Sequence, residues 1–183
     1  MTTYCDYCNS HPEDNYNKEY HDTQYGFPLN DDNLLFERLI LEINQAGLSW
    51  ITILKKADNF REAYRGFDIA KVAKFTEKDR ARLLADAGII RNRLKVNAAI
   101  VNAQRILELR KEYGSFKGWL DAHHPLTKEE WTKLFRKTFV FTGGEIVNEF
   151  LLSTGYLPGA HDKDCPVYKK VASLRPAWMK SRQ

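Results

Sequence analysis

The sequence of 183 residues lacks any sustained alternation of apolar and polar residues, the pattern of a half-buried β-strand. It also lacks an apolar run long enough to cross a membrane, and its first residues, MTTYCDYCNSHPEDNY, lack the basic and apolar regions of a signal peptide. No repeat and no low-complexity linker divides the chain. We therefore expect a cytoplasmic protein without membrane contact, formed by one domain over residues 1–183.

Cysteine is scarce, with three residues, and an odd number suits a disulfide framework poorly. In a reducing compartment such cysteines indicate metal ligands or free thiols. The 43% of hydrophobic and 28% of charged residues are sufficient for a sizeable core. A formal net charge of +4 is compatible with binding to a polyanion but does not establish it.

Apolar residues recur at intervals of three and four along most of the chain, which predicts an all-α fold. A first helix is expected from an Asp cap near residue 31 to Gly47, and a second from Ser49 to Gly66. Two further helices are expected at 76–87 and about 92–113.

The last third of the chain carries fewer signals. Thr127 and Glu130 read as a capping box, and a final helical run ends at Gly155. Beyond it three prolines predict an extended or irregular tail. We expect the helices to form two lobes that share a cleft.

The glycine between the two middle helices marks a hairpin, LLADAGIIRNRLKVNAAI, at 83–100. Gly88 allows a sharp turn, and Arg91, Arg93 and Lys95 lie at the start of the next helix, where free backbone N–H groups favour anions. This pattern predicts a helix-hairpin-helix phosphate clamp over about 76–113. An ordinary helical corner with basic residues is the alternative.

Potential metal ligands occur near both ends of the chain. The spacing of His161 and Cys165 lets both side chains reach one ion across a helical turn, and two pairs from opposite ends would make one tetrahedral zinc site. Such a site would tie residues of about 5–25 to residues of about 158–170. A redox pair is less favoured because it needs a βαβ context. The remaining candidate ligands are Cys5, Cys8 and His21.

Four motifs occur in order along the chain: YHDTQYG at 20–26, LEINQAGLSWITILKK at 41–56, DAGIIRNRLKVNAAIVNA at 86–103 and HDKDC at 161–165. Together they resemble the bacterial DNA-3-methyladenine glycosylase I family, within the helix-hairpin-helix DNA glycosylases, over almost the whole chain. The resemblance implies a DNA repair enzyme that flips 3-methyladenine out of alkylated double-stranded DNA and hydrolyses its glycosidic bond. The products would be free 3-methyladenine and an abasic site, and the enzyme would be a monomer.

The resemblance also implies a structural Zn²⁺. The family's first ligand precedes the His of YHD by thirteen residues, which selects Cys8 with His21 and leaves Cys5 over. The other two ligands would be His161 and Cys165.

The family's base pocket corresponds to Tyr20, Glu42 and Trp50, with Glu42 as the catalytic carboxylate. Leu48, beside the Trp, would fill the gap left by the flipped base. Without the resemblance, Glu42 would read as a surface residue at the edge of an apolar arc. With it, the carboxylate and aromatic rings are suited to a cationic base.

Two positions depart from the family pattern. Ser10 stands where an aromatic residue, two positions after the first zinc Cys, covers the other face of the base. Glu145 stands near a helix start, where it favours the helix dipole, with a role beside the pocket as the alternative. A non-catalytic protein that binds damaged bases, or one with altered specificity, therefore stays open.

Overall fold

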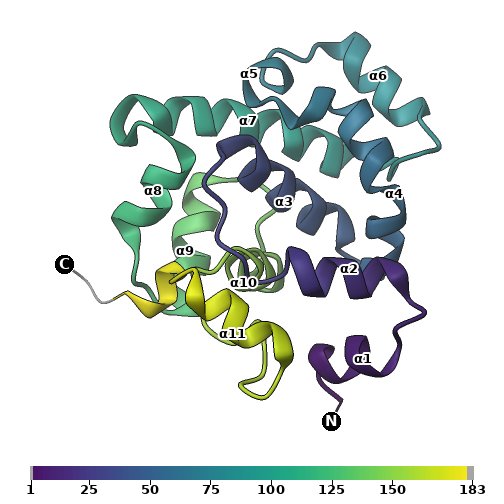
Figure 1. Cartoon of the computed structure of the whole chain (residues 1–183). Helices are drawn as coiled ribbons and strands as arrows, with labels where there is room; N and C mark the ends of the chain where they lie inside the picture. The colour runs from purple at the N-terminus through teal and green to yellow at the C-terminus, as the bar shows by residue number, and fades with distance from the viewer. Residues whose placement is uncertain (1, 181–183) are drawn as a thin grey trace.

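The computed structural model describes residues 2–180, and within this range every regular element is helical (Figure 1). The elements are α1 (Tyr4–Ser10), α2 (Asn15–Thr23), α3 (Asp32–Gln45), α4 (Trp50–Ala63), η1 (Arg65–Phe67), α5 (Ile69–Val72), α6 (Glu77–Ala85), α7 (Arg93–Tyr113), α8 (Phe116–His123), α9 (Lys128–Thr138), α10 (Gly144–Ser153), α11 (Pro166–Ser173) and η2 (Ala177–Met179). The all-α prediction is confirmed.

Helix starts follow the predicted capping residues. The Asp31 side chain accepts a hydrogen bond from the backbone N–H of Leu34 at the start of α3. The capping box at Thr127 and Glu130 is present. Ser49 is the N-cap residue of α4, but its hydroxyl pairs with Thr52 Oγ1 at 2.7 Å rather than with the backbone. Local signals thus place most helix boundaries within one or two residues.

The predicted irregular tail is wrong in part, because residues 166–173 form α11. Pro166 occupies the first turn of that helix, where a missing N–H costs nothing. Helices α1 and α2 near the amino terminus were also not expected. Both are short, and the apolar residues that they bury are mainly those of the Cys/His region.

Helix α3 lies at the centre of the molecule, where it packs against α4, α7, α8 and α10. The predicted apolar arc is fully buried, and each such side chain contributes roughly 1.5–3 kcal/mol to folding. Its members are Leu35, Phe36, Leu39, Ile40 and Ile43. A residue at the edge of this arc is therefore held in a rigid environment.

The two ends of the chain meet on one side of the fold. In Figure 1, α1 (purple) and the loop before α11 (yellow) lie beside each other at the bottom of the molecule. Their contact is made by a small apolar cluster that includes Cys5 and Cys165 and is separate from the main core. None of the helices in residues 2–180 is both long enough and apolar enough to span a membrane.

Candidate functional site

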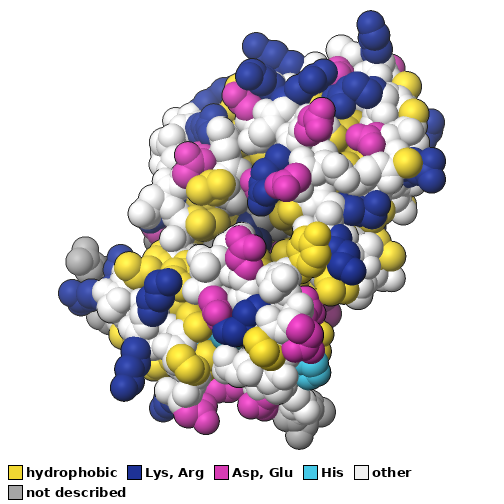
Figure 2. Space-filling model, turned by 45° about the vertical axis from the view of Figure 1, so that its right-hand side comes forward, with side chains coloured by type: hydrophobic (Ala, Val, Ile, Leu, Met, Phe, Trp, Pro, Cys, Tyr) yellow, Lys and Arg dark blue, Asp and Glu magenta, His cyan; other side chains and the backbone are white. Residues whose placement is uncertain are grey.

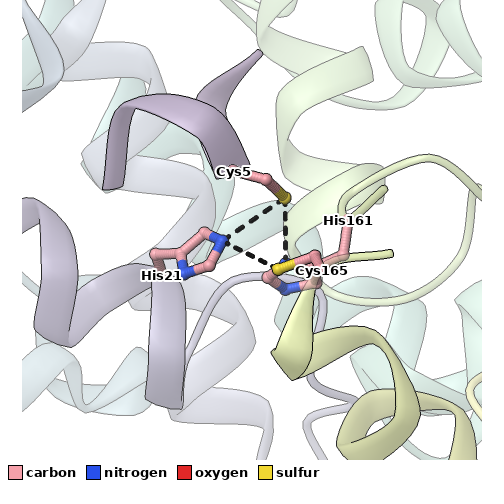
Figure 3. A group of neighbouring side chains, drawn as sticks. All are labelled: Cys5, His21, His161 and Cys165. Atoms are coloured by element: carbon pink, nitrogen blue, oxygen red, sulfur yellow. Dashed lines mark hydrogen bonds between the residues drawn. The ribbon is translucent and has the colours of Figure 1, made fainter. Parts of the chain in front are cut away.

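Four buried side chains from the two ends of the chain converge on one point (Figure 3). Cys5 comes from α1 and His21 from α2, while His161 and Cys165 come from the segment before α11. Their ligand atoms all lie within 4.8 Å of one another. This group is able to hold a metal ion.

The spacing of these atoms fits tetrahedral coordination. Cys5 Sγ lies 3.4 Å from His21 Nε2 and 3.6 Å from His161 Nδ1, and Cys165 Sγ lies 3.6 Å and 3.8 Å from the same two nitrogens. Bond lengths of about 2.3 Å to sulfur and 2.0–2.1 Å to nitrogen around a tetrahedral ion give sulfur-to-nitrogen edges of about 3.6 Å. The group therefore has the size of such a site.

Both imidazoles are oriented for ligation by their second nitrogen. His161 Nε2 donates to the carbonyl oxygen of Tyr25 at 2.7 Å, which leaves the Nδ1 lone pair facing the thiols. His21 Nδ1 lies 2.7 Å from the Asp22 carboxylate, which leaves Nε2 facing them. Such outer partners fix the tautomer of metal-binding histidines.

The thiols need positive charge nearby to ionise. Burial raises the pKa of the Cys5 thiol to about 12, and a bound divalent cation would reverse that effect. The backbone N–H of Asp162 also donates to Cys5 Sγ at 3.4 Å. The donor set and its surroundings fit a metal ion bound by two thiolates and two imidazoles.

The expectation that Cys8 is the fourth ligand is corrected by the structure. Cys8 is buried, but its Sγ faces the carbonyl oxygen of Asn17 at 3.7 Å, and Cys5 stands in the group instead. Counting thirteen residues back from His21 failed because residues 4–10 form a helix, in which Cys5 and Cys8 lie one turn apart on one face and meet different neighbours.

With Cys5 as the ligand, Ser10 no longer occupies the position two residues after the metal-binding cysteine. The residue two positions after the ligand Cys5 is Tyr7, whose ring stacks on His11 with centroids 4.4 Å apart. Ser10 itself is exposed and donates to the carbonyl oxygen of Asp6 at 2.7 Å. Ser10 therefore forms a hydrogen bond within the last turn of α1, and within residues 2–180 the structure shows no hydrogen bond from it to the base pocket.

Glu42 is only 4% exposed, which is unusual for an acidic residue. Burial and, next, the negative charge of Glu149 raise the pKa of its carboxyl to about 8, against the opposing charge of Arg38. At neutral pH the group is therefore mostly protonated in the empty protein. Such a displaced pKa beside other polar groups marks a candidate functional site.

Tyr20 and Trp50 form the aromatic part of this site. Their ring centroids are 5.1 Å apart, and the Arg38 guanidinium lies over the Tyr20 ring at 5.1 Å. Tyr20 Oη and Trp50 Nε1 are both buried without a hydrogen-bond partner. Buried polar atoms normally have a partner, so both donors are available to a ligand that enters this region.

Both aromatic residues line a surface groove of about 560 Å³. Tyr20, Trp50 and Arg38 are among its lining residues, whereas the Glu42 carboxyl group is not. The face shown in Figure 2 is hollowed across its middle, and Lys and Arg side chains gather above the hollow, in the half of the molecule that contains α5 to α7.

The predicted hairpin joins α6 to α7. Arg91 and Arg93 are exposed at its end. Gly88 does not have a positive φ; a Cβ there would lie 3.0 Å from Asp86 Oδ1 and 3.1 Å from Asn59 Nδ2, so these side chains would have to shift slightly to admit one. Asn59 donates to the Gly88 carbonyl at 3.2 Å, so the hairpin is attached to α4.

Lys95 does not join the two arginines, which corrects its place in the clamp. It is 5% exposed, and its Nζ donates to the carbonyl oxygens of Asn44 and Ala46, each at 2.7 Å. These are the last carbonyl groups of α3 and its cap, which attract a cation. A phosphate cannot reach an ammonium group placed there.

Leu48 is held outward in the turn between α3 and α4. Its side chain is 40% exposed, and Gln45 Nε2 donates to its carbonyl oxygen at 3.2 Å. Gly47 before it has a φ of 79°, which favours glycine. An exposed leucine on a fixed turn, two residues from Trp50, is suited to insertion into a partner.

Sequence reasoning missed two charged residues of the site. Arg38 precedes Glu42 by one helical turn, and its Nη1 donates to the Ser153 carbonyl at 3.1 Å. Glu149 on α10 is half-buried and acts on Glu42. A Glu within the apolar run IVNEFLL was the available signal.

Glu145, in contrast, has an 88% exposed side chain paired with Lys128 at 3.4 Å, in keeping with a helix-start role.

Comparison with known proteins gives consistent results. A family model described as methyladenine glycosylase matches residues 8–133. A DNA-3-methyladenine glycosylase of Haemophilus influenzae is 36% identical over 185 residues, which cover 91% of this chain and 98% of that protein.

Solved structures agree in sequence and in fold. A mutant of 3-methyladenine DNA glycosylase I from Staphylococcus aureus is 33% identical, with a TM-score of 0.80 over 88% of this chain and 96% of that one. A second structure of the S. aureus enzyme, which concerns its recognition of 3-methyladenine, is 34% identical, with a TM-score of 0.76 over 84% and 91%. With a family model that matches more than half of its length, and with relatives alike over nearly all of it, this chain belongs to the methyladenine glycosylase family.

Proposed function

We propose that this protein is a monofunctional DNA-3-methyladenine glycosylase, which removes the alkylated base from double-stranded DNA by hydrolysis. The observation that carries the proposal is the buried Glu42 carboxyl group beside two unpartnered donors, Tyr20 Oη and Trp50 Nε1, in a chain of this family. The H. influenzae relative is named for the same activity.

Recognition rests on charge and stacking. Methylation at N3 makes the base of the intact nucleotide a cation, which an aromatic pocket with carboxylates attracts more than neutral adenine. Tyr20 and Trp50 provide ring surface, worth about 1–3 kcal/mol per stacked base. When the cation enters, Glu42 loses its proton more easily and accepts charge-assisted hydrogen bonds.

In the reaction the bond between N9 and the sugar C1′ breaks, and its electron pair goes to N9, so the base leaves neutral. A water oxygen then bonds to C1′ and releases a proton, which completes the abasic sugar. The methyl group already activates the leaving base, so strong base activation is unnecessary. Lys95, the amine that a Schiff-base route would use at the hairpin, is bonded to two carbonyl groups, so strand cleavage is not expected.

The DNA duplex would be held by the helix-hairpin-helix motif, in a fold of two lobes that share a cleft. The exposed Arg91 and Arg93 follow the turn at Gly88, where a side chain would crowd Asp86 and Asn59, and they would contact phosphates. Leu48 would enter the gap that the flipped nucleotide leaves, as apolar wedges do in bent duplexes.

Zn²⁺ is the metal that best suits the buried group. Cys5, His21, His161 and Cys165 would hold it as a closed tetrahedral site, which leaves no position for substrate. Its contribution would be structural, because it joins α1 and α2 to the segment before α11. The protein would act as a monomer in the cytoplasm.

Free 3-methyladenine provides a direct test of the pocket. A ligand that binds only the folded protein at 100 times its Kd raises stability by about 2.7 kcal/mol. We expect 3-methyladenine to raise the melting temperature of the protein, and adenine to raise it less. Trp50→Ala should remove the effect. Equal protection of the parent and of Trp50→Ala would show that the base binds elsewhere.

A further inference from the structure

Glu149 lies on α10, whose last turn is bonded to the base pocket. The carbonyl oxygen of Ser153 accepts hydrogen bonds from Arg38 Nη1 at 3.1 Å and from the backbone N–H of Gly26 at 2.9 Å. Glu149 precedes Ser153 by one helical turn, and Glu42 follows Arg38 by one turn of α3. Since α10 packs against α3, the two carboxylates belong to the same small region.

Glu149 lies close to Tyr25, with which its carboxylate shares a hydrogen bond, and the Tyr25 ring lies 5.8 Å from the Tyr20 ring. The negative charge of Glu149 raises the pKa of Glu42, and it acts in the same direction on the hydroxyl groups of Tyr20 and Tyr25. Those residues come from α3, from α2 and from the loop that follows α2. The half-buried Glu149 carboxylate therefore lies near the aromatic residues of the site.

Glu149 and Glu42 differ in how far they are removed from water. Glu42 is almost fully buried, whereas Glu149 is half-buried and accepts a hydrogen bond from the Asn148 side chain at 3.4 Å. Two adjacent carboxyl groups do not ionise together easily, and the more exposed one ionises first. Burial also raises the pKa of the Glu149 carboxyl, but Glu149 is the more exposed of the two and therefore carries the negative charge more readily than Glu42.

We propose that Glu149 is a specificity-determining residue of the base pocket, whose carboxylate supplies the negative charge that favours a cationic alkylated purine over a neutral one. This inference rests on the proposed glycosylase function. The unpartnered Tyr20 Oη and Trp50 Nε1 provide the evidence that a ligand belongs in this region. A cation bound there is attracted by Glu149 and lowers the pKa of Glu42, whose proton is released to water.

The test uses two small purines that differ in charge. The 3,9-dimethyladeninium ion carries the permanent charge of the alkylated nucleotide, and 9-methyladenine is its neutral counterpart. Calorimetric titration should show that Glu149→Gln weakens binding of the cation by about 5- to 30-fold and changes binding of the neutral purine less than twofold. Glu149→Asp keeps the charge and should recover most of the loss.

Glu145→Gln is the matched control, because Glu145 lies one turn earlier on α10, exposed and paired with Lys128. It should bind the cation like the parent. If Glu149→Gln and Glu145→Gln both bound the cation as well as the parent, Glu149 would have no part in specificity.

A pH series separates a charge effect from a loss of shape. The groups that face the two carboxyls are Arg38, Tyr20 and Tyr25, while the exposed pair Glu145 and Lys128 acts on Glu149 only by its charge from the solvent side. None of these groups is altered in Glu149→Gln. In the parent, affinity for the cation should rise as pH increases through about 8, where Glu42 ionises. In Glu149→Gln this rise should occur at lower pH, because the charge that opposes ionisation of Glu42 is gone. An unmoved profile would overturn the proposal.

Failure of this inference and failure of the glycosylase function give different results. If the parent releases 3-methyladenine from methylated DNA while Glu149→Gln retains full preference for the cation, the function stands and the role of Glu149 is refuted. If the parent releases no base, the function itself fails.

Discussion

The ammonium group of Lys95 lies 2.7 Å from the carbonyl oxygen of Asn44 and joins the first turn of α7 to the end of α3. This bond connects the hairpin to the turn that carries Leu48 and Trp50. Lys95→Met should therefore lower the free energy of unfolding by about 1.5–3 kcal/mol, because two buried carbonyl groups lose a charged donor. Urea unfolding measures the change.

The same variant separates a structural role from DNA contact. Once it is folded, the salt dependence of its binding to undamaged duplex should match that of the parent. A reduced salt slope with unchanged stability would return Lys95 to the phosphate clamp.

Arg91 and Arg93 should affect DNA binding rather than stability, the reverse of what is expected for Lys95. Replacing either by Ala should weaken binding to every duplex and reduce the slope of log K against log salt by about one for each lost phosphate contact. Stability should change little, since both side chains are exposed. Arg136→Ala, on the exposed side of α9, is the control and should leave the slope unchanged. Altered base preference with an intact slope would speak against the assignment.

The two neighbouring cysteines give a sharp test of the metal centre. Cys5→Ser should abolish binding of zinc and destabilise the fold by an amount on the order of several kcal/mol, because metal binding and folding are coupled. Cys8→Ser, on the same helix, should keep one zinc per chain. Elemental analysis and melting curves give both readings, and the reverse pattern would restore the register counted from His21.

The Glu42 carboxyl group should lower the free energy of unfolding at high pH. It has a pKa of about 8 in the folded protein and an ordinary value near 4.5 when unfolded, so between these values the folded state binds more protons. Stability contributed by this group is full below about 4.5 and is lost as pH rises through about 8. Glu42→Gln should therefore stabilise the protein more at pH 9 than at pH 5, while slowing excision. A pH-independent difference in melting temperature would show that Glu42 is not the titrating group.

The sequence predicted most helices because their caps and apolar arcs are local, as at Asp31 and Thr127. It did not predict α1, α2, α5, α8 or α11, which are short. Of these, α1 and α11 owe their burial to the contact between the chain ends. The choice between Cys5 and Cys8, which share one face of α1, depends on which turn of α1 lies against His21, and counting residues along the chain cannot show that. Likewise, a basic residue near a hairpin resembles a phosphate ligand until its partner is seen, as with Lys95.

The place of Glu42 in a buried pocket was expected only from the family resemblance. Periodicity placed it at the edge of an apolar arc, where exposure was the ordinary expectation, and the structure buries it almost completely. Glu149 comes from a helix about a hundred residues further along the chain, so its effect on Glu42 becomes visible only when α10 packs on α3.

The measurement that tests the central claim most directly is the identity of the product released from methylated double-stranded DNA. Incubation with the zinc-loaded protein should release free 3-methyladenine, identified by mass spectrometry, with one abasic site for each base and no strand breaks before alkali treatment. Trp50→Ala should release it much more slowly. Tight binding to the methylated duplex without release of any base would contradict the account and identify a damage-binding protein instead.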